Sequence, residues 1–211
     1  NVKINNNHSH DFKLSNDSTA HPDMIQFWTT GTTVSSKNIE ISGNYLDMGS
    51  GVATQSIFMR NERVDMGDAG TEMYYQNVSI SNNVIRNGHA HGITVGEKNN
   101  LRVDNNTIIQ SVTQDLGGTV SVPTINVKST STNVSVTDNV LPKLGADLLT
   151  PRAGWNVSNN FVAQRDDISA DNFVGRFFVD ALDQDQISIG DFQKLPGGVL
   201  DTLNVGANLA P

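Results

Sequence analysis

Histidines occur at equivalent places in two short apolar segments of this 211-residue chain. His21 and His89 each lie four residues before an isoleucine, Ile25 or Ile93, and His91 lies two residues before Ile93. Histidine gains and loses a proton near neutral pH, so neighbouring histidines can supply a general base and a general acid. The spacing predicts that these three histidines gather where the strands of one sheet begin.

An aspartate and an arginine extend this group. Asp23 stands two residues before Ile25, the same offset as His91 from its isoleucine. Arg60 ends the next apolar segment, and a guanidinium can stabilise negative charge that develops on a substrate. The candidate catalytic residues are His21, Asp23, Arg60, His89 and His91.

Aromatic, amide and charged side chains suited to a polar polymer occur in the same segments. A sugar ring stacks on an aromatic side chain, and its hydroxyl or carboxylate groups accept and donate directed hydrogen bonds. The candidate substrate-binding residues are Gln26, Trp28, Glu62, Tyr74, Tyr75, Lys98 and Lys128. In the alternative interpretation these residues have only structural roles. The histidines then lie in turns, Arg60 and Glu62 form an exposed ion pair of little energetic value, and Lys128 is solvated.

Four segments must position these side chains: DMIQFW, QSIFMR, HGITVG and PTINVK. Their apolar residues alternate, which indicates strands with one buried face. When Ile25, Ile57, Ile93 and Ile125 are aligned and point inward, the polar and aromatic candidates fall on the opposite face. A long insertion, residues 61–76, leaves the end of this face, and we expect it to form one wall of a groove.

A second pattern repeats along the chain: Asn, apolar, polar, apolar, two polar residues with Asn second, then an apolar pair. Six copies begin at Asn1, Asn38, Asn77, Asn100, Asn133 and Gly154. The copies begin 21 to 39 residues apart. Repeats of about 20 to 40 residues are typical of solenoids, in which each unit buries its apolar face against its neighbours. The alternation within each copy predicts β units.

One asparagine recurs near the end of every copy, and amide side chains stacked in register can form hydrogen-bonded ladders. These asparagines are Asn7, Asn44, Asn83, Asn106, Asn139 and Asn160. On this pattern the chain resembles the right-handed parallel β-helix of the pectin-lyase-like superfamily. The resemblance implies an all-β fold, a right-handed parallel β-helix solenoid over residues 1–162.

Residues 163–211 do not continue the repeat, and we expect them to form a small C-terminal cap with Trp155 in the core beneath it. Because the chain begins inside a repeat, we also expect further N-terminal coils before residue 1.

Composition narrows the choice of partners. The net charge of −8 argues against nucleic acid, and no apolar run is long enough for membrane insertion. There is no cysteine, so disulfides and thiolate metal sites are excluded. We expect no metal site, with calcium bound by Asp65, Asp68 and Glu72 as a lesser alternative.

The resemblance implies a polysaccharide as partner and an extracellular, cell-surface or virion location. Proteins of this superfamily include polysaccharide lyases, uronate C5-epimerases, glycoside hydrolases and phage tailspike depolymerases, the last typically homotrimers. His21-Pro22-Asp23 is similar, in reversed order, to the Asp-Pro-His motif of alginate C5-epimerases. A lyase or C5-epimerase acting on a uronate-containing polysaccharide is our leading expectation. The alternatives are a glycoside hydrolase with two carboxylates and a non-catalytic carbohydrate-binding or structural module.

Overall fold

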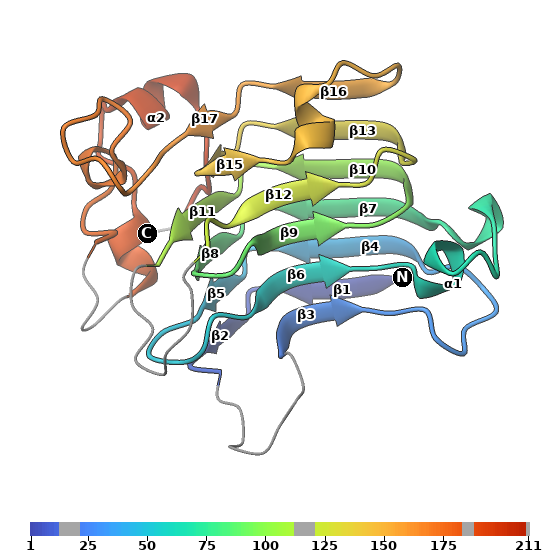
Figure 1. The fold of residues 1–211 in the computed structure, drawn as a ribbon. Helices are drawn as coiled ribbons and strands as arrows, with labels where there is room; N and C mark the ends of the chain where they lie inside the picture. Colours follow the sequence, from blue (N-terminus) through green and yellow to red (C-terminus); the bar gives the residue numbers. More distant parts are fainter. Residues whose placement is uncertain (13–21, 112–120, 183–187, 210–211) are drawn as a thin grey trace.

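The computed structural model describes residues 1–12, 22–111, 121–182 and 188–209. The chain winds into stacked coils, and the strands of successive coils form three sheets in which every pairing between strands is parallel (Figure 1). The predicted all-β parallel solenoid is confirmed. None of the helices in these described ranges has the length and apolar character needed to cross a membrane.

The first sheet contains the six copies of the repeated phrase. Its order is β1 (Val2–Asn5), β4 (Lys37–Ser42), β7 (Tyr75–Ser81), β10 (Lys98–Asp104), β13 (Thr132–Thr137) and β16 (Trp155–Ser158). The apolar positions stack in register, as in the column Ile39, Val78, Leu101. These side chains are buried in the main core, as their alternation predicts.

The second sheet comes from the apolar pair that ends each phrase. It contains β2 (His8–His10), β5 (Tyr45–Asp47), β8 (Val84–Asn87), β11 (Thr107–Gln110), β14 (Val140–Leu141) and β17 (Phe161–Val162). A residue with positive φ separates it from the first sheet in each coil, for example Asn82 (φ 56°) or Gly43 (φ 65°). Asparagine and glycine tolerate this left-handed conformation, so the phrase turns a corner there.

The asparagine after each corner forms the predicted ladder. Asn83 donates through Nδ2 to Asn106 Oδ1 at 2.9 Å, and its own Oδ1 accepts from Asn44 Nδ2 at 2.8 Å. The same bond joins every adjacent pair from Asn7 to Asn160. Four of the six side chains are fully buried, so the ladder satisfies polar groups inside the solenoid.

The third sheet contains β3 (Asp23–Phe27), β6 (Gln55–Met59), β9 (His91–Val95), β12 (Thr124–Val127) and β15 (Lys143–Leu144). It lies in front in the view of Figure 1. The four aligned isoleucines are paired in register and buried. The predicted register of this sheet is therefore confirmed, while β15 was not predicted.

Short helices connect or follow the strands. They are α1 (Glu62–Asp65), η1 (Thr71–Met73), η2 (Ala146–Leu149), η3 (Val174–Arg176), η4 (Ile189–Phe192) and α2 (Val199–Leu203). The first two lie in the insertion after β6, and η2 follows β15 beside β12.

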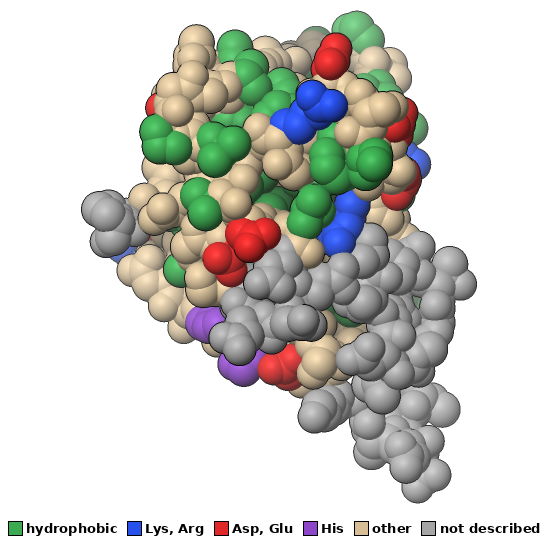
Figure 2. All heavy atoms as spheres, turned by 90° about the vertical axis from the view of Figure 1, so that its left-hand side faces the viewer, with side chains coloured by type: hydrophobic (Ala, Val, Ile, Leu, Met, Phe, Trp, Pro, Cys, Tyr) green, Lys and Arg blue, Asp and Glu red, His purple; other side chains and the backbone are tan. Residues whose placement is uncertain are grey.

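The described parts of the C-terminal segment, residues 163–182 and 188–209, lie along the outer face of the second sheet. Phe177, Phe178 and Phe192 pack there with Tyr45 and Val84, forming a second apolar cluster separate from the main core. Trp155 instead packs against the main core and donates to Ser131 O at 3.0 Å. Figure 2 faces this side of the molecule and shows hydrophobic side chains scattered among polar ones.

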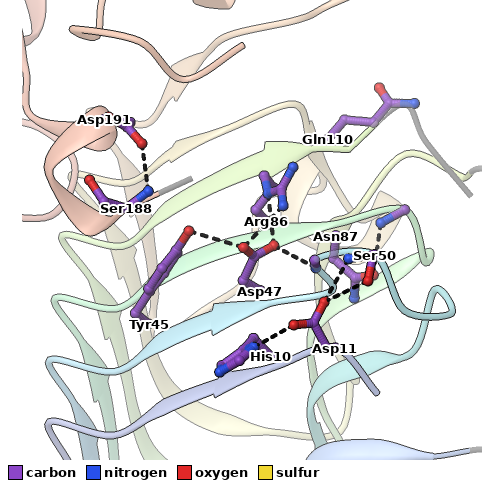
Figure 3. A network of polar contacts seen from close by, with 12 residues as sticks. His10, Asp11, Tyr45, Asp47, Ser50, Arg86, Asn87, Gln110, Ser188 and Asp191 are labelled. Atoms are coloured by element: carbon purple, nitrogen blue, oxygen red, sulfur yellow. Dashed lines mark hydrogen bonds and ion pairs between the residues drawn. The ribbon is translucent and has the colours of Figure 1, made fainter. Parts of the chain in front are cut away.

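A buried ion pair lies at the edge of this second cluster (Figure 3). Arg86 donates through Nε and Nη2 to the two oxygens of Asp47, at 2.7 and 3.0 Å. The Tyr45 hydroxyl also donates to Asp47 Oδ2, at 3.1 Å, and the Tyr45 ring contacts Phe192. The network thus links the second sheet to the C-terminal segment.

Candidate functional site

A groove of about 550 Å³ crosses the outer face of the third sheet. Strands β6, β9 and β12 form its floor, and residues of α1 and η2 border it. Its polar side chains are those of Arg60, Asp65, His91, Thr94, Asn126, Lys128 and Asp147, and Phe58 adds an aromatic ring. Three of the candidate residues, Arg60, His91 and Lys128, are therefore brought together.

A β-bulge turns His91 toward this groove. Thr124 pairs with His91 and Ile125 with Ile93, so β9 carries one extra residue, Gly92, relative to β12. A Cβ on Gly92 would lie 3.4 Å from the core side chain of Ile108. Bulges redirect side chains next to active sites. Gly92 therefore takes the inward position, and His91 joins the outer face.

The two neighbouring histidines are held by different partners. His91 Nδ1 lies 2.7 Å from Thr94 Oγ1, and its ring contacts the edge of Phe58. The backbone N–H of His91 donates to His89 Nδ1 at 3.1 Å, so that nitrogen of His89 carries no proton. Burial lowers the pKa of His91, which keeps its imidazole neutral at neutral pH.

An ionic cluster forms the end of the groove next to α1. Asp65 accepts from Arg60 Nε at 2.6 Å and also pairs with Lys128. Lys128 Nζ lies 2.6 Å from Glu97 Oε1 as well. The side chains of Arg60 and Lys128 are about half exposed, whereas those of Asp65 and Glu97 are largely buried. The two cations thus present their free sides to the groove.

These contacts also shift the pKa values of the cluster. Burial alone would raise the pKa of Asp65, but hydrogen bonds and charges from Lys128 and Arg60 lower it. Burial alone would lower the pKa of Lys128, but Asp65 and Glu97 raise it. Asp65 is therefore ionised and Lys128 protonated at neutral pH.

Six of the seven candidate binding residues lie outside the groove lining, and three of these are on or next to β3 and α1. Trp28 is exposed just beyond β3, with the Arg60 guanidinium 5.8 Å from its ring centre. Gln26 is exposed on β3, and Glu62 is half-buried at the start of α1. Trp28 is close enough to Arg60 to extend the binding surface toward β3.

Lys98 and Tyr75 do not lie on the outer face, which corrects two expectations. The chain leaves the third sheet after Val95, and Lys98 begins β10 of the first sheet, paired with Tyr75. Lys98 is fully buried, and Tyr75 is 1% exposed. The Tyr75 hydroxyl donates to Arg60 O at 3.1 Å, so Tyr75 supports the groove from beneath. Tyr74 is half-buried in the turn before β7.

Of the remaining catalytic candidates, His89 and Asp23 lie outside the groove lining. His89 lies beside His91, with 5.2 Å between ring centres, and Asp23 is the first residue of β3. Asp23 pairs with Gln55 in the β-ladder, at the end of the strand opposite to α1. His21 lies outside the described residues.

Three polar residues of the groove were not among the candidates. Thr94 and Asn126 stand in one outward column with Phe58, so the strand register could have identified them. Asp147, in η2, is paired with Arg152 at 2.6 Å. No pattern in the sequence connects Asp147 with the third sheet.

Two acidic residues of the insertion, Glu72 and Asp65, have protein partners. Glu72 accepts from Gly70 N at 2.8 Å, while Asp65 binds Arg60 and Lys128. Across the described parts of the chain, no three His, Asp or Glu side chains are grouped so that they could hold a metal ion.

The chain matches no protein-family model, no curated protein and no solved structure. Its function must therefore be inferred from the groove itself.

Proposed function

We propose that this chain is a pectin-lyase-like parallel β-helix whose groove binds a uronate-containing polysaccharide and acts on it as a lyase or C5-epimerase. One observation carries the proposal: His91, kept neutral by burial, shares the groove with two half-exposed cations, Arg60 and Lys128. A neutral imidazole can accept a proton, and cations can neutralise the carboxylate beside it.

In the first step, His91 Nε2 takes the proton from C5 of a uronate ring. The electron pair of the C–H bond delocalises toward the C6 carboxylate, whose added negative charge Arg60 and Lys128 stabilise. In a lyase, this pair then forms the C4–C5 double bond as the C4–O bond breaks and the leaving oxygen takes a proton. In an epimerase, C5 instead regains a proton on the opposite face of the ring.

His89 is suited to donate a hydrogen bond beside the base. Its Nδ1 accepts from a backbone N–H, so in the neutral ring the proton is on Nε2. A neutral imidazole does not release this proton near neutral pH, so the proton that the leaving oxygen or C5 takes comes from solvent. His89 lies next to His91 at one end of β9.

The groove is less suited to glycoside hydrolysis. Hydrolases need one of two carboxyl groups to be protonated at the working pH, and a raised pKa supplies that acid. Asp65 and Asp147 both line the groove, but Lys128 and Arg60 hold the pKa of Asp65 below its ordinary value. Asp65 is thus a poor general acid.

A second function, binding without cleavage, is favoured by the charge balance of the groove. Asp65 already pairs with both Arg60 and Lys128, so a substrate carboxylate must compete with it. A module that binds a neutral polysaccharide would need no such exchange. With either function we propose that the protein is extracellular or on a virion surface. If it is a tailspike, we also propose that it forms a trimer.

Incubation with uronate-containing and neutral polysaccharides tests the proposal. A lyase generates the ultraviolet absorbance of unsaturated uronates, and an epimerase changes the NMR spectrum of the polymer without cleaving it. His91→Ala should abolish either activity, while His10→Ala, an exposed histidine on β2, should leave it unchanged. Reducing ends without absorbance would indicate a hydrolase. Binding without any product would support the second function.

A further inference from the structure

Thr94 connects side chains from two adjacent coils on the groove floor. Its Oγ1 lies 2.7 Å from His91 Nδ1 and accepts from Asn126 Nδ2 at 3.3 Å. Thr94 and Asn126 are direct neighbours in the pairing of β9 with β12. The hydroxyl of Thr94 is therefore fixed from one side by Asn126 while it contacts the imidazole on the other.

The bulge makes this contact possible. In a regular strand, residues three apart point to opposite faces, so His91 and Thr94 would lie on different sides of the sheet. The extra residue in β9 puts both on the outer face. Phe58 lies on β6, the other strand next to β9, and pairs with Thr94. Its ring contacts the His91 imidazole, with 5.3 Å between ring centres.

We infer that Thr94 is a positioning residue that accepts the Nδ1 proton of His91 and so directs the basic Nε2 into the groove. This inference rests on the proposed function, because it assigns Thr94 its part in making His91 a base. Asn126 supports it by holding the Thr94 hydroxyl.

The hydrogen-bonding capacities fit this arrangement. A neutral imidazole has one N–H and one bare nitrogen, and a threonine oxygen has two lone pairs. Thr94 Oγ1 can accept from both Asn126 Nδ2 and His91 Nδ1–H, which leaves Nε2 as the proton acceptor. Among the described residues, His91 Nε2 has no hydrogen-bond partner.

The two histidines then have opposite tautomers. His89 accepts at Nδ1 and carries its proton on Nε2, whereas His91 carries its proton on Nδ1. His91 therefore offers a bare Nε2, whereas His89 does not accept at that atom. Thr94 thereby determines which histidine of the pair is the base.

NMR of protein labelled with ¹⁵N-histidine tests this without any substrate. The ring nitrogen shifts of His91 should report the Nδ1–H tautomer in the native protein and in Thr94→Ser, which keeps the hydroxyl. Thr94→Val keeps the shape but lacks the hydroxyl, and should lose that preference. Thr132→Val makes the same change at an exposed position at the start of β13 and should leave His91 unaltered. An Nε2–H tautomer in the native protein, or identical spectra for Thr94→Val, would overturn the inference.

Kinetics separate this inference from the proposed function. If the protein is active, Thr94→Val should lower kcat by roughly 10- to 100-fold with little change in KM, since general base catalysis typically contributes about 10²- to 10⁴-fold. Thr94→Ser should recover most of the loss. Absence of activity in the native protein would refute the proposed function, while the NMR result would still decide the tautomer.

Discussion

Lys98 Nζ lies 3.8 Å from the centre of the Tyr75 ring, and both side chains are enclosed beneath the ionic cluster of the groove. The ammonium faces the ring as in a cation–π contact, and its nitrogen also lies 3.4 Å from Glu97 O. Burial lowers the pKa of Lys98 well below that of a solvated lysine, against the opposing influence of Glu97 and Asp65. Lys98 is therefore a costly group in the core.

Lys98→Met should raise the free energy of unfolding at neutral pH by about 1–3 kcal/mol, because an apolar chain of similar length needs no buried ammonium. Between its folded pKa and about pH 10.4, Lys98 binds a proton in the unfolded chain that it lacks in the folded one. The native protein should thus gain stability as pH rises through this range, and the advantage of the variant should shrink.

Urea unfolding of the native protein and of Lys98→Met, from neutral to alkaline pH, measures how the difference in free energy of unfolding changes with pH. Lys37→Met is the matched control, since Lys37 is exposed at the start of β4 in the same sheet. It should leave the free energy of unfolding almost unchanged. A constant difference between Lys98→Met and the native protein at all pH values would contradict the low pKa.

The asparagine ladder predicts a position-dependent loss of stability. Asn83 Oδ1 accepts from the backbone N and the Nδ2 of Asn44, and Asn83 Nδ2 donates to Asn106 Oδ1 and Ile41 O. Asn83→Ala leaves several buried groups without partners, at about 1–3 kcal/mol each. We expect a total loss of about 3–5 kcal/mol.

Asn7→Ala is the control for the ladder. Asn7 is exposed and donates to Asn44 Oδ1, but no described residue donates to its own Oδ1. Its replacement should cost less than about 1 kcal/mol. Equal losses for Asn7→Ala and Asn83→Ala, measured as urea midpoints with unchanged slope, would show that the ladder contributes little.

Much of this fold can be predicted from the sequence because the repeat imposes it. The alternation places Val78 and Ile80 inside, and in-register stacking follows from the spacing of identical phrases. The structure divides each phrase between two sheets, so each phrase contains two strands. The reason is the left-handed conformation of Asn82, which asparagine permits but does not require.

The sequence predicted the candidate site only for residues whose place follows from the alternation and pairing of the strands. Register brings Arg60 and Lys128 to the same face, but simple alternation would turn His91 inward, and only the bulge at Gly92 reverses it. Lys98 was misplaced because counting positions along a strand fails once the chain turns into β10. Asp147 lies in η2, and the position of this helix beside the groove depends on tertiary packing, which the sequence pattern does not show.

The buried pair of Arg86 and Asp47 should couple the second sheet to the C-terminal segment. Arg86→Met leaves a buried carboxylate without its counter-charge, which costs about 3–5 kcal/mol. The double variant Arg86→Met, Asp47→Asn should recover part of this loss. Because Tyr45 contacts both Asp47 and Phe192, hydrogen exchange should increase in the C-terminal segment of Arg86→Met.

Lys3→Met provides the comparison for Arg86→Met. Lys3 pairs with Glu40 at 3.3 Å, and both side chains are exposed, Lys3 to 71% and Glu40 to 39%. Exposed ion pairs contribute about 0–1 kcal/mol, so this variant should unfold almost like the native protein. If Arg86→Met proved equally mild, the buried network would not anchor the C-terminal segment.

Asp65 should control the charge preference of the groove. Its carboxylate pairs with Arg60 and Lys128, the same cations that a bound uronate would need. Asp65→Asn keeps the shape and removes the competing charge. We expect tighter binding of an acidic oligosaccharide by roughly 1 kcal/mol, about fivefold in Kd, and no change for a neutral one.

Calorimetric titration at two salt concentrations measures this effect, with Asp68→Asn as the control. Asp68 is exposed in the same insertion, so its replacement changes the net charge equally without touching the groove. Tighter binding by Asp65→Asn alone, reduced at high salt, would identify Asp65 as the competitor. Weaker binding would instead mean that Asp65 holds Arg60 and Lys128 in place for the substrate, because their free sides are useful only while their positions are fixed.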